Sequence, residues 1–314
     1  MSFNKRILSP GGTPFVNNEN FRAVIYTGDG SNSRTITCGF QPDWVLFKRR
    51  DGSDNWRSLD SSRGFGFVNY FNLSNAQDGS SSPVYITVSA TGFSFTSNGY
   101  DNFNAAGNTY IVYCWKGGGG ATSNSDGSIT GTVNANAAAG FSIVEYTGSG
   151  SSASVGHGLD SAPKLIISKR KSSSSDWLAG AVTWTKYLEP NGTPPFRTAN
   201  VWTNTQPTST TFGVINSTSA SSVEYINYCF ADVAGYQKIA TYTGTGAAGN
   251  FIETGFEPAF VLIKNLDETA GWLIFDNARS TTNPRDDRLE LNNNQAEQTN
   301  STSKFVNFFA NGFE

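Results

Sequence analysis

The sequence predicts an all-β protein made of three tandem β-sandwich or jelly-roll-like units, preceded by a short extended N-terminal arm. Three observations lead to this prediction. Short apolar segments alternate with turns rich in glycine and asparagine, a pattern typical of sandwiches. The phrase Tyr-Thr-Gly-x-Gly occurs at 26–30, 146–150 and 242–246. No segment has the apolar period of a convincing amphipathic helix.

The residues that follow each copy of this phrase are also repeated. In every copy a proline lies 6 residues before a lysine and 14 residues before a tryptophan. Such agreement in residue type and spacing indicates an internal repeat. The predicted core positions of this repeat are Trp56, Trp177, Trp272, Pro42, Pro163 and Pro258.

The repeat divides the chain into five parts. An N-terminal arm (1–20) precedes unit 1 (21–116), a Gly/Ser-rich linker (117–140), unit 2 (141–234) and unit 3 (235–314). Each unit has roughly 100 residues, which is a usual size for a domain. The composition of the linker predicts a flexible or extended segment.

Unit 1 illustrates the strands that we expect in each unit. Segments 21–27 and 34–40 flank a turn with Asp29–Gly30 at its tip, which is a strong hairpin signal. Segment 43–47 is apolar on both faces, as in a buried strand, and the proline before it suits a first strand position. Segment 109–115 closes the unit. Because strands follow the glycines, we reject a phosphate-binding loop, which needs a helix there.

Unit 3 has no segment equivalent to this closing strand. After the motif at 91–95, unit 1 runs on to Trp115, whereas unit 3 reaches the equivalent residues at 311–314. Unit 3 is therefore predicted to be C-terminally incomplete, with an unpaired strand edge. We expect residues beyond 314 or another subunit to supply the strand.

Composition excludes several classes of function. The chain of 314 residues has 22 basic and 25 acidic side chains, so it has no basic field for nucleic acid. It contains no apolar run long enough for membrane insertion. Three cysteines, Cys38, Cys114 and Cys229, without a CxxC pair predict buried free thiols, no metal and no disulfide. No cofactor is expected.

Two Asp–Arg pairs recur four and seven residues after the repeat tryptophan. They are Asp60 with Arg63 and Asp276 with Arg279. An arginine fork of this kind can bind a sugar or a carboxylate. The alternative, which we favour, is a hydrogen-bonded loop that serves the structure, because unit 2 has Ala181 and Trp184 at these positions.

Other charged residues do not form a recognisable catalytic set. The basic clusters 48–50 and 169–171 are interpreted as solvated strand ends, and His157 as a turn residue. No nucleophile elbow and no paired carboxylates on alternating strand positions occur. We therefore predict no catalytic residue and no enzyme.

Two groups of residues are candidates for binding. Aromatic side chains in polar loops can stack on a glycan or cap the end of a sandwich, and the candidates are Tyr100, Phe103 and Trp202. The arm has apolar residues without a pattern for self-packing, so we expect it to dock on a partner chain. These docking residues are Phe3, Ile7, Leu8, Phe15 and Val16.

The repeated segments at 39–64 and 242–279 resemble a tandem β-sandwich repeat domain of virion structural proteins of tailed phages, notably phages of marine bacteria and cyanobacteria. The resemblance covers about 22–314. It implies a virion protein assembled in the host cytoplasm, without assigned catalytic residues. The expected role is a tail fibre or tail-attached receptor-binding component for host attachment; the alternatives are a capsid decoration protein or head fibre and, third, a carbohydrate-active enzyme. Expected partners are other virion proteins, further copies of the chain and a host surface glycan.

Overall fold

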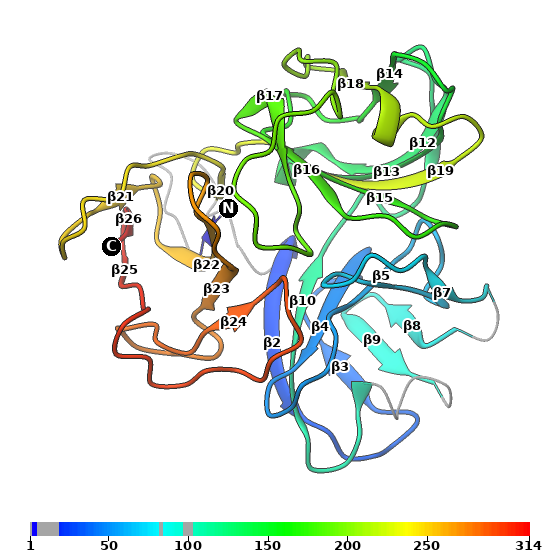
Figure 1. Ribbon diagram of the computed structural model, residues 1–314. Helices are drawn as coiled ribbons and strands as arrows, with labels where there is room; N and C mark the ends of the chain where they lie inside the picture. The colour runs from blue at the N-terminus through cyan, green and yellow to red at the C-terminus, as the bar shows by residue number, and fades with distance from the viewer. Residues whose placement is uncertain (1, 5–18, 82–83, 97–102) are drawn as a thin grey trace, which may run out of the picture.

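The computed structural model describes residues 2–4, 19–81, 84–96 and 103–314, and all of its sheets are antiparallel. The predicted all-β class is confirmed. Figure 1 shows three units around a common centre, with unit 2 at the top, unit 1 at the lower right and unit 3 at the left. Each unit has one large sheet and one small sheet.

Unit 1 has a six-stranded large sheet and a three-stranded small sheet. The large sheet has the order β2 (Phe21–Thr27), β10 (Thr109–Trp115), β4 (Trp44–Arg49), β5 (Arg57–Asp60), β6 (Phe67–Tyr70) and β7 (Asp78–Gly79). The small sheet has the order β3 (Thr35–Thr37), β9 (Gly92–Phe95) and β8 (Ile86–Ser89). The predicted closing strand, β10, lies between β2 and β4 and pairs with both.

Unit 2 has seven strands in its large sheet and two in its small one. The large sheet has the order β11 (Thr122–Asn124), β12 (Gly131–Asn136), β13 (Phe141–Thr147), β19 (Glu224–Phe230), β15 (Leu165–Arg170), β16 (Leu178–Ala181) and β17 (Thr183–Leu188). The small sheet consists of β14 (Ala153–Gly156) and β18 (Thr211–Val214). Two short 3-10 helices, η2 (Ala137–Ala139) and η3 (Asn216–Thr218), complete the unit.

Of the two alternatives predicted for 117–140, flexible or extended, the flexible one is wrong, because this segment supplies the extended strands β11 and β12. The Asp43 carboxylate accepts bonds from the Gly117 amide at 2.7 Å and from Asn134 at 2.8 Å. Asn134 in turn accepts from the Gly118 amide at 2.5 Å. These buried partners fix a glycine-rich segment whose composition alone suggests freedom.

Unit 3 has five strands in its large sheet and three in its small one. The large sheet has the order β20 (Gln237–Lys238), β1 (Ser2–Asn4), β22 (Pro258–Lys264), β23 (Trp272–Asp276) and β24 (Leu289–Glu290). The small sheet has the order β21 (Ile252–Glu253), β26 (Gly312–Phe313) and β25 (Phe308–Phe309).

The strand between β20 and β22 corrects two predictions. Residues 2–4 of the same chain, in place of the expected residues beyond 314 or another subunit, fill part of the position that β10 holds in unit 1. Phe3 lies opposite Gln237 and Phe260, the register position that Trp115 holds in unit 1 and Phe230 in unit 2. The start of the arm is thus a strand of unit 3, and both ends of the chain lie there (Figure 1).

The large sheets share one register and one core. Pairs Trp44–Asp60, Leu165–Ala181 and Phe260–Asp276 each join the residue two after the proline to the residue four after the tryptophan. Buried side chains from all three units form one central hydrophobic cluster. Between the large and small sheets, the outer clusters have sixteen, fourteen and five buried residues in units 1, 2 and 3, so among the described residues the outer layer of unit 3 is thin.

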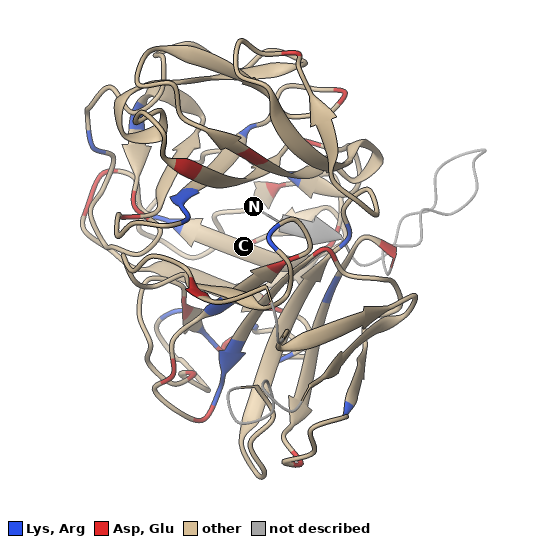
Figure 2. Ribbon diagram, turned by 90° about the vertical axis from the view of Figure 1, so that its right-hand side faces the viewer, with Lys and Arg blue, Asp and Glu red and all other residues tan. Residues whose placement is uncertain are grey.

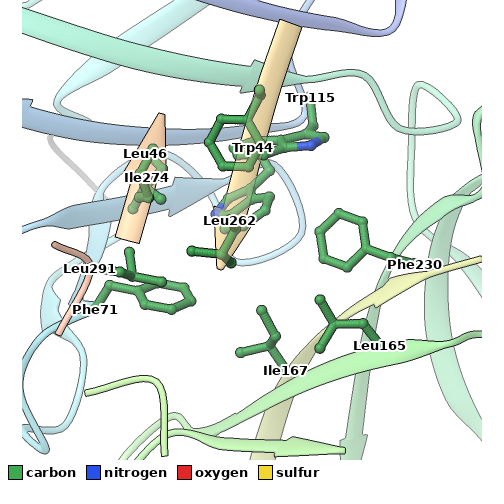
Figure 3. A pocket seen from close by; sticks show the side chains of 11 residues that line it. Trp44, Leu46, Phe71, Trp115, Leu165, Ile167, Phe230, Leu262, Ile274 and Leu291 are labelled. Atoms are coloured by element: carbon green, nitrogen blue, oxygen red, sulfur yellow. The ribbon is translucent and has the colours of Figure 1, made fainter. Parts of the chain in front are cut away.

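A small apolar cavity lies in the central cluster. It encloses about 30 Å³ and its lining comes from all three units, including Trp44, Trp115, Phe230 and Ile274 (Figure 3). A water molecule needs two or more polar partners to stay in such a space. The aromatic and aliphatic lining offers none, so we interpret the cavity as a packing gap where three sheets meet.

Candidate functional site

The three repeat tryptophans join the units to one another. Trp56 and Trp177 are completely buried and Trp272 is 4% exposed. Each indole N–H donates to a main-chain carbonyl of another unit: Trp56 to Glu290 at 2.9 Å, Trp177 to Tyr70 at 3.1 Å and Trp272 to Glu189 at 3.2 Å. Unit 1 therefore binds unit 3, unit 3 binds unit 2 and unit 2 binds unit 1, which closes a ring.

An asparagine in each unit binds the main chain of the repeat tryptophan of that unit. The side-chain oxygens of Asn72, Asn191 and Asn292 accept from the main-chain N–H of the tryptophan in their own unit, at 2.9, 2.9 and 2.7 Å. The carbonyl that receives a neighbouring indole lies two residues before each asparagine. The sequence analysis did not find these asparagines, because their distance from the tryptophan along the chain varies. It is 16, 14 and 20 residues in the three units.

The repeat lysines cross the same junctions. Lys48 donates to the Asn294 carbonyl at 3.3 Å and Lys169 donates to the Ser74 carbonyl at 3.2 Å. Lys264 follows the same pattern, with the Thr193 carbonyl at 2.9 Å. Each acceptor lies two residues after the junction asparagine of the neighbouring unit.

Burial makes two of these lysines unusual. Lys48 and Lys169 are each 1% exposed, and burial lowers the pKa of both to about 8. Carbonyl oxygens satisfy their ammonium groups, as buried polar groups require. The prediction of solvated strand ends at 48–50 and 169–171 is therefore wrong for Lys48 and Lys169.

Main-chain bonds complete each junction. The amides of Glu297, Gln77 and Phe196 donate to carbonyls of the neighbouring units at 2.7, 2.8 and 2.9 Å. At the junction of units 1 and 3, Arg50 also binds Glu297 through two N–H···O contacts of 2.6 and 2.9 Å. This side-chain bond raises the pKa of Arg50.

The two Asp–Arg pairs are fully buried ion pairs. Arg63 binds Asp60 and Arg279 binds Asp276, each with an Nε–Oδ2 distance of 2.6 Å and with side chains that are 0% exposed. Burial opposes the positive charges, but the adjacent carboxylates outweigh it and raise the pKa of both arginines. The favoured interpretation as a structural loop agrees with this burial, which leaves no carboxylate free for a ligand.

A tyrosine from a neighbouring unit completes each pair. Tyr228 of unit 2 donates to Asp60 at 2.8 Å, and Tyr113 of unit 1 donates to Asp276 at 2.7 Å. Burial, with the nearby carboxylate, raises the pKa of both tyrosines. We call each set an Asp–Arg–Tyr cluster; it was not predicted, because its third member lies more than 160 residues away.

Comparison with known proteins places these units in a family. The model of a family described as "Domain of unknown function (DUF7483)" matches residues 17–314. The chain belongs to the DUF7483 family. No curated protein and no solved structure matches it. The matched residues run through all three units, so the DUF7483 model includes all three junctions between them.

Two of the aromatic residues predicted to contact a glycan are buried in this DUF7483 chain. Phe103 is 1% exposed and packs on Phe47 at a ring-centroid distance of 4.7 Å. Trp202 is also 1% exposed and packs edge-on against Trp184 at 5.5 Å. Both belong to the outer clusters, so the glycan-contact prediction is wrong for them; Tyr100 lies outside the described residues.

His157 directly follows β14, in a segment where the structure assigns no turn. It is completely buried, its Nδ1 accepts from the Leu159 amide at 3.1 Å, and its Nε2 lies 3.2 Å from the Thr208 carbonyl. These partners assign the tautomer with hydrogen on Nε2. Burial lowers the pKa of His157, which keeps the imidazole neutral near pH 7.

All three cysteines are buried free thiols. Cys38 and Cys114 share a side-chain hydrogen bond, which lowers the pKa of Cys38, while burial raises the pKa of Cys114. Cys229 is separate, and burial raises its pKa to about 12. The sequence did not predict that Cys38 and Cys114 lie next to each other.

The remaining candidates are charged groups and the arm. Among the described residues, no group of three or more metal-ligating side chains occurs and no helix is long and apolar enough to cross a membrane. Charged side chains are scattered over the three units (Figure 2). Of the predicted docking residues, Phe3 lies in β1 of unit 3, which contradicts docking on a partner there; Ile7, Leu8, Phe15 and Val16 lie outside the described residues.

A polar groove of about 930 Å³ lies beside the 117–119 backbone. Lys116, Gln41 and Asp43 contribute to its lining. The Asp43 carboxylate is 2% exposed and accepts from Ser61, Gly117 and Asn134. Its acidic group therefore holds the chain and is not available to a ligand.

Proposed function

We propose that this chain is a structural protein of a phage virion without catalytic activity, and that it serves as a tail fibre or tail-attached receptor-binding component. The likeness of its repeated segments to a tailed-phage virion domain supports the virion context. One structural observation carries the structural role: the polar side chains that recur in the sequence bind main-chain carbonyls of neighbouring units.

This arrangement suits a part that transmits force or holds its shape. An enzyme needs nucleophiles, acids or bases that converge in one cleft. Here the tryptophans and lysines shared by the repeat lie in three separate junctions, where they join each unit to its two neighbours. Displacing one unit would break bonds at two junctions at once, so the ring resists deformation.

The alternative location is the capsid. Tail fibres often have a heptad-repeat stalk, and the sequence has none. A compact three-unit body without a stalk also fits a capsid decoration protein or head fibre. In both cases the proposed partners are other virion proteins and further copies of this chain; host surface glycan is a proposed ligand of the tail component only.

Labelling of intact particles tests the proposal and separates the two locations. Gold-labelled antibodies against the purified chain would be applied to phage particles whose protein content is known from mass spectrometry. We expect label at the tail, with capsid label as the alternative. An unrelated cytoplasmic protein of the infected host serves as the control for carry-over. Absence of the chain from purified particles would refute the virion role.

A further inference from the structure

The repeated Tyr-Thr-Gly-x-Gly turn receives a main-chain segment in unit 1. The Gly28 amide donates to the Asn108 carbonyl at 2.7 Å, and the Gly30 amide donates to the Asn104 carbonyl at 2.8 Å. The segment 103–108 then leads directly into β10, which lies between β2 and β4 in the large sheet. In this unit the turn is thus a receptor for the residues that precede β10.

Unit 2 repeats this arrangement with a different segment. The Gly148 amide donates to the Val223 carbonyl at 2.8 Å, and the Gly150 amide donates to the Ser219 carbonyl at 2.7 Å. Here the bound segment leads into β19. The two occupants share small side chains in the turn followed by a tyrosine-containing strand, with the sequences FNAAGNTYIV (103–112) and TSASSVEYIN (218–227).

The tyrosine of the motif takes part in the same way in both units. The Tyr26 hydroxyl donates to the Phe103 carbonyl at 2.5 Å, and the Tyr146 hydroxyl donates to the Thr218 carbonyl at 2.6 Å. Both rings are buried under the bound segment, with 9% and 5% exposure. Tyrosine and both glycines therefore contribute to one recognition unit for a peptide backbone.

The first glycine of the motif is required because the bound backbone comes very close. A Cβ atom at Gly28 would lie 2.1 Å from the Ala105 carbonyl oxygen, and one at Gly148 would lie 2.3 Å from that of Ala220. No side chain tolerates such contacts, so glycine permits the close approach. A glycine at this position of the sequence therefore indicates a turn that is built to receive a backbone segment.

Unit 3 has the same motif, and its turn is open. None of the described residues lies within 4 Å of a Cβ placed at Gly244 or Gly246. The Tyr242 ring, equivalent to two buried rings, is 46% exposed. Figure 1 shows the loop that holds this motif at the outer edge of unit 3, beyond β20.

The adjoining strand position is also only partly filled. In unit 1, β10 contributes seven residues to the pairing with β2, whereas in unit 3 β1 contributes Ser2 and Phe3 to the pairing with β20. Residues 240–243, which correspond to the last part of β2, form no strand and are exposed. The open turn is therefore continuous with an exposed stretch whose counterpart in unit 1 is the last part of β2.

We infer that residues 240–246 are a docking site for an extended segment of a different polypeptide chain. The two internal occupants define its chemistry: a turn of small residues whose carbonyls accept from Gly244, Gly246 and the Tyr242 hydroxyl, followed by a strand that adds to the sheet edge. Addition of a strand from a partner is an established mode of peptide recognition. The inference rests on the geometry of the three turns, and it holds whether or not the proposed virion role is correct.

Binding of peptides to the full-length chain tests this site. The probes are synthetic peptides of sequence 103–112 and 218–227, with scrambled peptides as controls, followed by fluorescence anisotropy. We expect saturable binding, and at least about a tenfold loss of affinity in Gly244→Val, because the new side chain occupies the path of the peptide carbonyl and removes at least one hydrogen bond. Ala248→Val, in the same exposed loop but outside the turn, should bind normally.

The same substitution separates binding from folding. Because Gly244 has open space around it and no positive φ, Gly244→Val should keep the melting temperature of the chain. Gly28→Val should lower it, since the equivalent space in unit 1 is occupied by the chain itself. Equal peptide binding by Gly244→Val and the unmodified chain, or no binding of either peptide, would overturn the inference.

Two further measurements identify the occupant. Hydrogen exchange should show unprotected Gly244 and Gly246 amides in the isolated chain and protected amides with peptide bound. Protection in the isolated monomer would mean that the chain fills its own site, contrary to the inference. A dimer that Gly244→Val dissociates would make a second copy the occupant and likewise overturn the assignment to a different chain.

Discussion

The junctions of unit 1 with its two neighbours differ from the junction of units 2 and 3. All three have the indole bond, the lysine bond and the main-chain bond. Among the residues that the structure describes, a buried Asp–Arg–Tyr cluster occurs at the two junctions of unit 1 and not at the third. At the third junction, unit 2 has Ala181 where the others have aspartate, and β1, which takes the place of β10 in unit 3, contains no tyrosine.

The aspartate and the tyrosine of the cluster are thus both missing at the junction of units 2 and 3. A buried ion pair is favourable only when its remaining donors and acceptors are satisfied. An aspartate in unit 2 would face unit 3 without a tyrosine donor from β1, so alanine avoids an unsatisfied buried charge. The comparison teaches that the indole and lysine bonds define the ring, whereas the ion-pair cluster depends on what the neighbouring strand can donate.

Removal of β1 should have the largest effect on this comparison. In a chain without residues 1–4, β20 and β22 lose their shared partner, and each buried main-chain group left unpaired costs about 1–3 kcal/mol. We expect hydrogen exchange to show loss of protection at 237–238 and 258–261, with units 1 and 2 still protected. A chain that lacks the exposed Ala247 and Ala248 of unit 3 serves as the control for a deletion in this unit. Unchanged protection in unit 3 would contradict the assignment of β1 to its sheet.

Truncation of the repeat tryptophans should be nearly as damaging at all three junctions. Trp56→Ala, Trp177→Ala and Trp272→Ala should each lower the free energy of unfolding by about 3–5 kcal/mol, because each removes a buried ring. Chemical denaturation followed by circular dichroism gives the values. Trp184→Ala is the control, because it removes a buried ring of equal size from an outer cluster, away from the junctions. A loss below about 1 kcal/mol at one junction would break the equivalence of the three.

The aspartates test the difference between the junctions. Asp60→Ala or Asp276→Ala leaves a buried arginine without its partner, which should destabilise the chain by about 3–5 kcal/mol. Replacing a whole cluster, as in Asp60→Ala with Arg63→Met and Tyr228→Phe, should recover most of that loss and imitate the third junction. A triple variant no more stable than the single one would show that the cluster contributes net stability by itself.

The smallest predicted effect concerns a position that differs in all three units. Cys38 and Thr254 donate to the carbonyl two residues later, at 3.1 and 2.6 Å, whereas His157 accepts from the amide of Leu159. The histidine version responds to pH near neutrality, because the ordinary pKa of histidine is about 6.5. Burial lowers its pKa, and the Thr208 carbonyl and Asp126 offset only part of this shift.

Because the folded pKa of His157 is depressed, the unfolded chain binds the proton more readily. The stability from His157 is therefore present above its unfolded pKa of about 6.5 and is lost as pH falls below that value. We expect the melting temperature to decrease from about pH 7.5 to 5.5, and His157→Thr to reduce that decrease. The two proteins are compared by the slope of melting temperature against pH. A loss of stability that is the same at every pH does not change this slope. An equal slope in both proteins would show that His157 does not cause the pH dependence of the melting temperature.

The sequence predicted the strands and the equivalence of the tryptophans for a simple reason. Residues that bury one face of a sheet must recur at fixed spacing, so the repeated Pro–Lys–Trp steps indicated shared strands and a shared core. A different argument, from the polarity of neighbouring residues, failed for Phe103 and Trp202. Polar neighbours suggested exposed loops, but large aromatic rings gain more from the outer core of the sandwich than from solvent.

By itself, the sequence determined the all-β class, the repeated register and the burial of Trp56, Trp177 and Trp272, because these follow from local pattern and from spacing along the chain. Tertiary structure alone decided the junction partners, the Asp–Arg–Tyr clusters, the ordering of 117–140 and the entry of residues 2–4 into unit 3. Those features depend on which distant groups meet, sometimes more than 200 residues apart. Spacing within a repeat does not specify such meetings, since main-chain carbonyls, which accept most of these bonds, look the same at every position in the sequence.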